Sequence, residues 1–175
     1  MKTVLVTGPI GGGKSEACRY FASQGYPVYD CDSRCKALYQ SIPGLKERIE
    51  EELGIPFDML AIIFSDDTLR EKLENLVYPL LLDDLRQWLT GLGDASRFAF
   101  VESAVASDRP GFNFPFDRSI CITASYYLRL ERNPKVAVRD SLQHFNLEKF
   151  DAVVYNDKSM EDLYASLNEI IDTVL

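Results

Sequence analysis

The sequence predicts a three-layer α/β fold built on a five-stranded parallel sheet. Short apolar runs of strand length alternate with amphipathic stretches of helix length along most of the 175 residues. This alternation is typical of βα units whose strands are buried on both faces. The length suits one domain with at most small insertions. The first strand is expected over residues 4–7, directly before a glycine-rich loop at residues 8–13.

The remaining elements follow from the spacing of apolar residues and from the turn residues between them. The helix after the loop begins at Lys14 and is expected to end at Gly25. Pro79 lies inside the longest expected helix and should kink it. The other strands are expected over 27–29, 97–101, 119–122 and 152–155, and the other helices over 33–53 with a break at 42–44, 66–89, 125–132, 135–145 and 160–171.

Composition and charge exclude several classes of protein. Hydrophobic residues make up 46% and charged residues 26% of the chain, which is ordinary for a globular protein and argues against disorder. The net charge of −8 argues against a nucleic-acid binder, which needs a surplus of Lys and Arg. The four cysteines form no C-x-x-C pair, which argues against a structural zinc site. With no signal peptide and no transmembrane run expected, we predict a cytosolic protein with reduced cysteines.

The segment from Gly8 to Ser15 matches the phosphate-binding pattern G-x-x-x-x-G-K-[ST]. It lies between a buried strand and a helix, where loop N–H groups and the helix N-terminus favour an anion. The pattern predicts that Lys14 reaches the β- and γ-phosphates of a nucleotide and that the Ser15 hydroxyl ligates Mg²⁺. We therefore predict a P-loop NTPase fold. Its nucleotide-binding residues would be Gly8, Pro9, Ile10, Gly11, Gly12, Gly13, Lys14, Ser15 and Glu16.

Two aspartates, Asp30 and Asp32, follow the second expected strand. Ligands of open α/β sheets bind at the carboxyl ends of the strands, so we expect these carboxylates near the phosphate loop. An aspartate there can orient an acceptor hydroxyl, take its proton or help to hold Mg²⁺. The same pattern can instead cap the helix that follows at Ser33. The chain has no N-K-x-D, and the strand ending at Val101 does not lead into D-x-x-G, so a kinase is favoured over a GTPase.

With both motifs in place, the chain resembles the dephospho-CoA kinase family. That family opens with a strand, a loop ending in G-K-S, a helix and a strand ending in D-x-D, which here spans residues 7–32. Tyr78-Pro79 stands where the family has H-P, and Arg139 precedes Gln143 by four residues, as in the family. The run Asp-Ala-Val-Val-Tyr-Asn at 151–156 is similar to the family's A-D-x-V-I-x-N.

The resemblance implies ATP-dependent, Mg²⁺-requiring phosphorylation of the ribose 3′-hydroxyl of dephospho-CoA to give CoA, the last step of coenzyme A biosynthesis. It implies Asp32 as the carboxylate that activates the acceptor and helps to hold the metal. Arg139 would approach the ATP phosphates and act with Lys14 in catalysis, and Asn156 would lie near the adenine. The expected partner is a small-molecule substrate, with no nucleic acid and no membrane, and the expected assembly is a monomer or weak homo-oligomer.

The resemblance also implies one P-loop kinase domain over residues 1–175. This domain would have a core, a helical insertion on the CoA side and a short lid. The core would comprise 1–32, 93–124 and 146–175, the insertion 33–92 and the lid 125–145.

Two departures from the family pattern leave alternatives open. Glu16 replaces the usual threonine after Ser15, which puts an extra negative charge beside the phosphate site. The lid is short, because Arg132 leads almost at once to Arg139. Fewer lid cations mean weaker stabilisation of the charge on the transferring phosphoryl group. The alternatives are a nucleoside or nucleotide kinase of the same fold and a non-catalytic nucleotide-binding relative.

Overall fold

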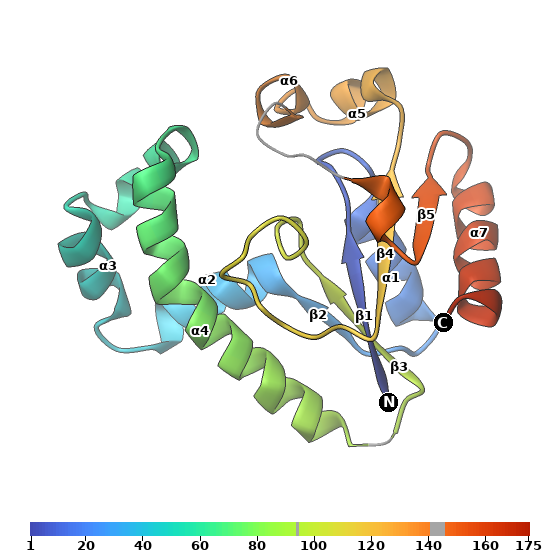
Figure 1. Ribbon diagram of the computed structural model, residues 1–175, viewed down its shortest axis with the longest axis horizontal. Helices are drawn as coiled ribbons and strands as arrows, with labels where there is room; N and C mark the ends of the chain where they lie inside the picture. The colour runs from blue at the N-terminus through green and yellow to red at the C-terminus, as the bar shows by residue number, and fades with distance from the viewer. Residues whose placement is uncertain (94, 141–145) are drawn as a thin grey trace. The chain divides into compact units, whose positions relative to one another are not determined.

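A computed structural model describes residues 1–93, 95–140 and 146–175, and a five-stranded sheet runs through it (Figure 1). Each strand pairs in parallel with its neighbours, in the order β2-β3-β1-β4-β5. The predicted α/β fold with a five-stranded parallel sheet is therefore confirmed. The strands are β1 (Lys2–Thr7), β2 (Val28–Asp30), β3 (Phe98–Glu102), β4 (Arg118–Thr123) and β5 (Ala152–Tyr155).

Helices follow the strands along the chain. α7 begins with a capping box, in which the side chains of Ser159 and Asp162 each accept a hydrogen bond from the other's backbone N–H. The second lid helix was expected over 135–145, and its residues 141–145 lie outside the described part of the chain. The elements packed around the sheet or following β4 are α1 (Lys14–Ser23), α5 (Tyr126–Arg132), α6 (Val136–Arg139), the 3-10 helix η3 (Leu147–Lys149) and α7 (Met160–Thr173).

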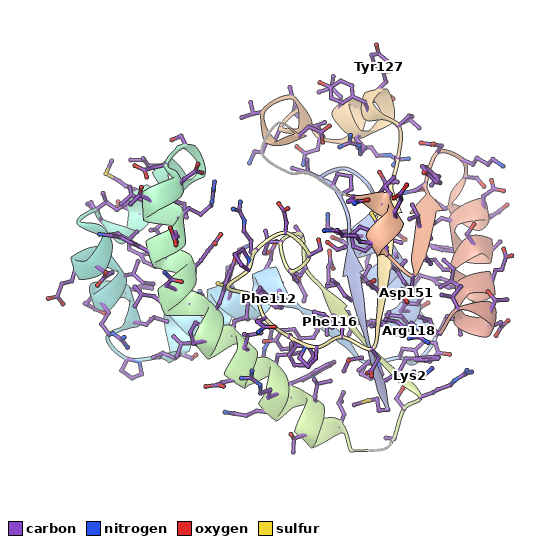
Figure 2. The ribbon with its side chains drawn as sticks, in the orientation of Figure 1. Lys2, Phe112, Phe116, Arg118, Tyr127 and Asp151 are labelled. Carbon is purple, nitrogen blue, oxygen red and sulfur yellow. The ribbon has the colours of Figure 1, made fainter. Side chains whose placement is uncertain are left out.

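One face of the sheet packs against α1 and α7. Phe21 of α1 and Leu167 of α7 are fully buried in one cluster with side chains from β1, β3, β4 and β5. The rings of Phe21 and Phe100 stack with their centroids 3.8 Å apart, so α1 lies close against β3. In the loop between β3 and β4, the rings of Phe112 and Phe116 stack with their centroids 6.5 Å apart (Figure 2). Packing of α1 on the sheet fixes the helix that begins directly after the phosphate loop.

The chain forms two compact units, one of residues 1–30 with 92–175 and one of residues 31–91. The second unit has its own core, to which Ile49 and Val77 contribute. We predicted a helical insertion over 33–92, and its role as the CoA side of a single kinase domain stays a prediction. No helix in the described ranges combines the length and apolar character needed to span a membrane. The helices of the second unit are α2 (Cys31–Ser41), α3 (Leu45–Leu53), the 3-10 helix η1 (Phe57–Ser65) and α4 (Asp67–Leu92).

Two of these helices differ from the sequence prediction. α2 begins at Cys31, so Asp32 lies in the first turn of a helix and not at the end of a strand. A carboxylate is favourable there because the helix N-terminus carries a partial positive charge. Residues 57–65 form a 3-10 helix where no element was expected, because their apolar residues follow one another without a helical or strand period. α4 includes Pro79 within its 26 residues, as expected.

Candidate functional site

The glycine-rich loop lies directly on the end of β4. A Cβ atom added to Gly8 would stand 2.1 Å from the carbonyl oxygen of Ile122, which is far inside van der Waals contact. The φ angle of Gly8 is +138°, a conformation that side chains rarely adopt. The parallel pairing of β1 with β4 brings these two backbones together. Only a residue without a side chain fits at this position.

Each backbone carbonyl of the loop from residue 8 to residue 13 accepts a hydrogen bond from this chain. Buried or partly buried carbonyls need such donors, because an unmade hydrogen bond is costly. The protein therefore shapes the loop before any nucleotide arrives. The donors to the carbonyls of residues 8 to 13, in that order, are the Lys14 ammonium at 2.8 and 3.2 Å, Arg129 at 3.5 Å, Arg132 at 3.3 Å, the Asn156 amide at 3.1 Å and the Ala17 N–H at 3.0 Å.

Carboxylates at the ends of β2 and β3 surround the Ser15 side of the site. The Ser15 hydroxyl donates to the Glu102 carboxylate at 2.6 Å, and the strand register sets Asp30 directly beside Glu102. Glu102 also accepts from the thiol of Cys18, whose pKa is raised first by burial and then by the charge of Glu102, so this thiol stays protonated. Hydroxyl and carboxylate oxygens are the ligands that Mg²⁺ prefers. The donor set around Ser15 therefore fits a magnesium ion.

Glu102 is a site residue that sequence reasoning missed. Its signal was present, since an acidic side chain at the end of a buried strand is the same pattern that drew attention to Asp30. The pattern points to the phosphate loop only when β3 is known to lie between β2 and β1. That neighbourhood is set by contacts between segments about a hundred residues apart in sequence, as in the hydrogen bond from Ser15 to Glu102 with its separation of 87 residues.

Two arginines bind the start of the predicted lid to the phosphate loop. Arg129 is only 8% exposed, and besides the loop its guanidinium donates to the Ala124 carbonyl at 3.0 Å and to both carboxylate oxygens of Asp140, one of them at 2.8 Å. Arg132 donates to the carbonyl of Asn156 at 2.9 Å as well as to the loop. Arg132 was noted in the sequence as a residue of the short lid, whereas no role was predicted for Arg129. The structure describes the backbone of Arg139 at the end of α6 and not its side chain, so its predicted phosphate contact lies outside the described atoms.

The ion pair between Arg129 and Asp140 is expected to make stability depend on acid pH. Hydrogen bonding to Arg129 lowers the pKa of Asp140 below its ordinary value of 3.8. A carboxyl whose folded-state pKa is depressed contributes its full stabilisation above the unfolded value and loses it as pH falls through the folded value. We expect Asp140→Asn to lower the free energy of unfolding at neutral pH by about 1 kcal/mol, as for a partly exposed pair. The difference from the unmodified chain should vanish in strong acid.

Urea unfolding followed by circular dichroism at a series of pH values measures this difference. Asp172→Asn is the matched control, because Asp172 is an exposed carboxylate of α7. A difference between the Asp140→Asn chain and the unmodified chain that persists unchanged into strong acid would contradict the assignment of the effect to this ion pair.

Glu16 takes part in a contact between α1 and α7. Its carboxylate accepts from the Tyr164 hydroxyl at 2.6 Å and forms an ion pair with Arg19. The hydrogen bond from Tyr164, followed by that from Arg19, holds the pKa of Glu16 below its usual value. The charge that the sequence predicted beside the phosphate site is therefore present but paired with a guanidinium. The nucleotide-binding role predicted for Glu16 stays a prediction.

The structure brings several of the predicted site residues together and leaves others apart. Lys14 and Asn156 both bond to the loop at 8–13, and Ser15 meets Glu102 at its edge. Asp32 belongs to the second compact unit, two residues after the end of β2. Its predicted roles in catalysis and metal binding stay predictions.

A preassembled phosphate loop, with carboxylates at the ends of the neighbouring strands, is the arrangement of P-loop kinases. The family model described as dephospho-CoA kinase matches residues 2–150. The dephospho-CoA kinase of Porphyromonas gingivalis is 32% identical over 141 residues, covering 75% of this chain and 68% of that protein. The dephospho-CoA kinase of Rickettsia bellii is 26% identical over 186 residues, covering 98% of this chain and 96% of that protein. The chain belongs to the dephospho-CoA kinase family, as its resemblance predicted.

The fold agrees with this membership. The solved structure of dephospho-CoA kinase from Campylobacter jejuni matches with a TM-score of 0.65 at 18% identity, covering 98% of this chain and 96% of that chain. Similarity at this identity shows the fold alone. Family membership makes the chain a kinase, that is, a phosphotransferase with an alcohol group as acceptor.

Proposed function

We propose that the chain transfers the γ-phosphoryl group of ATP to the ribose 3′-hydroxyl of dephospho-CoA, giving CoA and ADP. Membership of the family supports the acceptor. The observation that carries the proposal is the phosphate loop, in which every carbonyl from residue 8 to residue 13 is already held by the protein. We further propose the cytoplasm as the compartment of this reaction and a monomer or weak homo-oligomer as the working form.

The transfer divides into three tasks for this chain. Lys14 and the loop N–H groups hold the β- and γ-phosphates, and Arg139 adds positive charge where the transferring group becomes more negative. Asp32 takes the proton of the 3′-hydroxyl as that oxygen bonds to the γ-phosphorus. The bond from the γ-phosphorus to the bridging oxygen then breaks, and ADP leaves with the electron pair. Catalysis comes from in-line positioning and from fixed charges.

Oxygen ligands from several elements would hold Mg²⁺. These are the Ser15 hydroxyl, the Glu102 carboxylate that accepts a hydrogen bond from it, and Asp32. When bound, the ion neutralises charge on the phosphate oxygens. Mg²⁺ usually takes only one or two carboxylates from the protein and its other ligands from phosphates and water.

The pairing of Glu16 bears on the non-catalytic alternative. An uncompensated carboxylate next to Ser15 was one of the two grounds for that alternative. Since Arg19 and Tyr164 both bond to this carboxylate, its charge is partly compensated within the chain. This supports phosphoryl transfer over mere nucleotide binding.

Coupled measurement of ADP release in the presence of dephospho-CoA tests the proposed function. Nucleosides and nucleoside monophosphates serve as competing acceptors at matched concentration. Turnover with dephospho-CoA well above that with the other acceptors is the expected result. Turnover with a nucleoside or nucleotide alone would support the alternative kinase, and intact ATP binding without turnover of any acceptor would support the non-catalytic relative.

Substitution of Glu102 tests the magnesium site. Glu102→Gln keeps the size of the side chain and an acceptor for Ser15 but removes the negative charge. We expect kcat to fall by about 10- to 100-fold, the usual effect of losing a residue that orients a metal ligand. The Mg²⁺ concentration for half-maximal activity should rise in parallel. Glu131→Gln, an exposed residue of α5, is the control, and an unchanged magnesium dependence in Glu102→Gln would contradict the assignment.

A further inference from the structure

Asn156 lies at the point where the end of β5 meets the phosphate loop. The residue is 6% exposed, and its side-chain amide Nδ2 donates to the carbonyl of Gly12 at 3.1 Å. Its backbone is fixed on both sides, because its N–H donates to the carbonyl of Thr123 at 2.7 Å and its carbonyl accepts from Arg132 at 2.9 Å. Asn156 is therefore held in place by three separate contacts, one through its side-chain amide and two through its backbone.

The side-chain amide of Asn156 lies directly against the backbone of Gly13. A Cβ atom on Gly13 would stand 2.3 Å from Nδ2 of Asn156, and Gly13 has a φ of +107°. Contact between the two residues therefore depends on the glycine as much as on the asparagine. The side chain of Asn156 fills the space that a larger residue at position 13 would need.

The hydrogen bond to Gly12 fixes the orientation of one peptide group of the loop. No described peptide bond is cis. In a trans peptide the C=O of one residue and the N–H of the next point in opposite directions. When Asn156 holds the Gly12 carbonyl on its own side, the Gly13 N–H must point to the other side. Arg132 acts in the same way on the preceding peptide group, through the Gly11 carbonyl.

We propose that Asn156 is a positioning residue for the phosphate loop, which aims the Gly13 N–H at the phosphates of the nucleotide and does not read its base. The proposal rests on the proposed function, since it requires the loop to bind nucleotide phosphates. Fixed N–H groups stabilise an anion without reorganisation at the moment of binding. Loss of the Asn156 side-chain amide leaves the peptide group between Gly12 and Gly13 free to rotate. The affinity of the loop should then fall for every ligand that it binds through phosphate groups.

Binding of ligands with and without a base tests the proposal. Calorimetry compares ATP, GTP and inorganic tripolyphosphate, each with Mg²⁺, in the unmodified chain and in Asn156→Ala. We expect Asn156→Ala to lower the affinity for ATP and the affinity for tripolyphosphate by the same factor, about 10-fold or 1.4 kcal/mol. A loss for ATP with unchanged tripolyphosphate binding would show that Asn156 reads the adenine and would overturn the proposal. Unchanged affinity for both ligands, with lowered thermal stability alone, would overturn it as well.

A control variant and a second replacement of Asn156 complete the test. Asn168→Ala removes an exposed amide from the same compact unit, where it accepts from Tyr20, and should leave both affinities within about twofold, as for surface changes. Asn156→Ser is a smaller polar replacement and serves if Asn156→Ala does not fold. If the unmodified chain binds tripolyphosphate but does not phosphorylate dephospho-CoA, the proposed function is contradicted. The role of Asn156 is then still decided by the measured affinities of Asn156→Ala for ATP and tripolyphosphate.

Discussion

Replacement of Lys14 by methionine is expected to lower kcat for phosphoryl transfer by about 10³-fold, the range found for a cation that stabilises the transferring phosphoryl group. The ammonium of Lys14 donates to the carbonyls of Gly8 and Pro9, so it lies within the curve of the loop. When nucleotide binds, its charge is available to the β- and γ-phosphates. Methionine keeps the length and apolar body of the side chain and removes only the charge and the hydrogen bonds.

Steady-state kinetics with ATP and dephospho-CoA measure this effect, together with calorimetric ATP affinity. Lys149→Met is the matched control, since Lys149 is exposed in η3. We expect the control to retain the activity of the unmodified chain. A Lys14→Met chain with kcat within tenfold of the unmodified chain would rule out the catalytic role of this lysine.

The second large effect is expected from Asp32→Asn. Loss of a general base costs about 10²- to 10⁴-fold in rate, and asparagine cannot take the proton of the acceptor hydroxyl. ATP binding in the absence of Mg²⁺ should change little, because the phosphate loop is formed by residues of the other compact unit. The expected signature is therefore a fall in kcat with nearly constant ATP affinity.

A matched control and a measurement of thermal stability separate this role from a structural one. Asp58→Asn removes an exposed carboxylate from the same compact unit and should leave kcat unchanged. A loss of kcat that comes with lowered thermal stability, or a kcat within tenfold of that of the unmodified chain, would count against Asp32 as the base.

Local patterns predicted the sheet and the phosphate loop well. β1 and α1 follow from a buried apolar run, a glycine-rich loop and a helical period, all contained in residues 2–23. The segment that forms η1 was missed because its apolar residues have no period, so neither strand nor helix was indicated. The start of α2 at Cys31 was missed because an aspartate at a strand end and one in a first helical turn look alike in sequence.

The contacts that shape the site were harder to predict, because they join distant parts of the chain. Asn156 was expected near the adenine, and its bond to Gly12 spans 144 residues. Glu102 was passed over because the neighbours of β3 cannot be known before the strand order. Arg129 reaches the Ile10 carbonyl over 119 residues, and no short pattern marks it. Sequence motifs named the residues that are proposed to touch the nucleotide, whereas the residues that support the loop could be identified only from the fold.

The close approach of Gly8 to the carbonyl of Ile122 has a consequence for how such sequences diverge. Selection on this glycine comes from the neighbouring strand as well as from the ligand, since any side chain at position 8 would strike β4. A descendant that no longer transferred phosphate would still need the glycine in order to fold. Substitutions would instead appear first at Lys14 and Asp32, because their proposed roles are in the phosphoryl-transfer reaction. Among related chains, those two positions distinguish a working kinase from an inherited scaffold better than the glycines do.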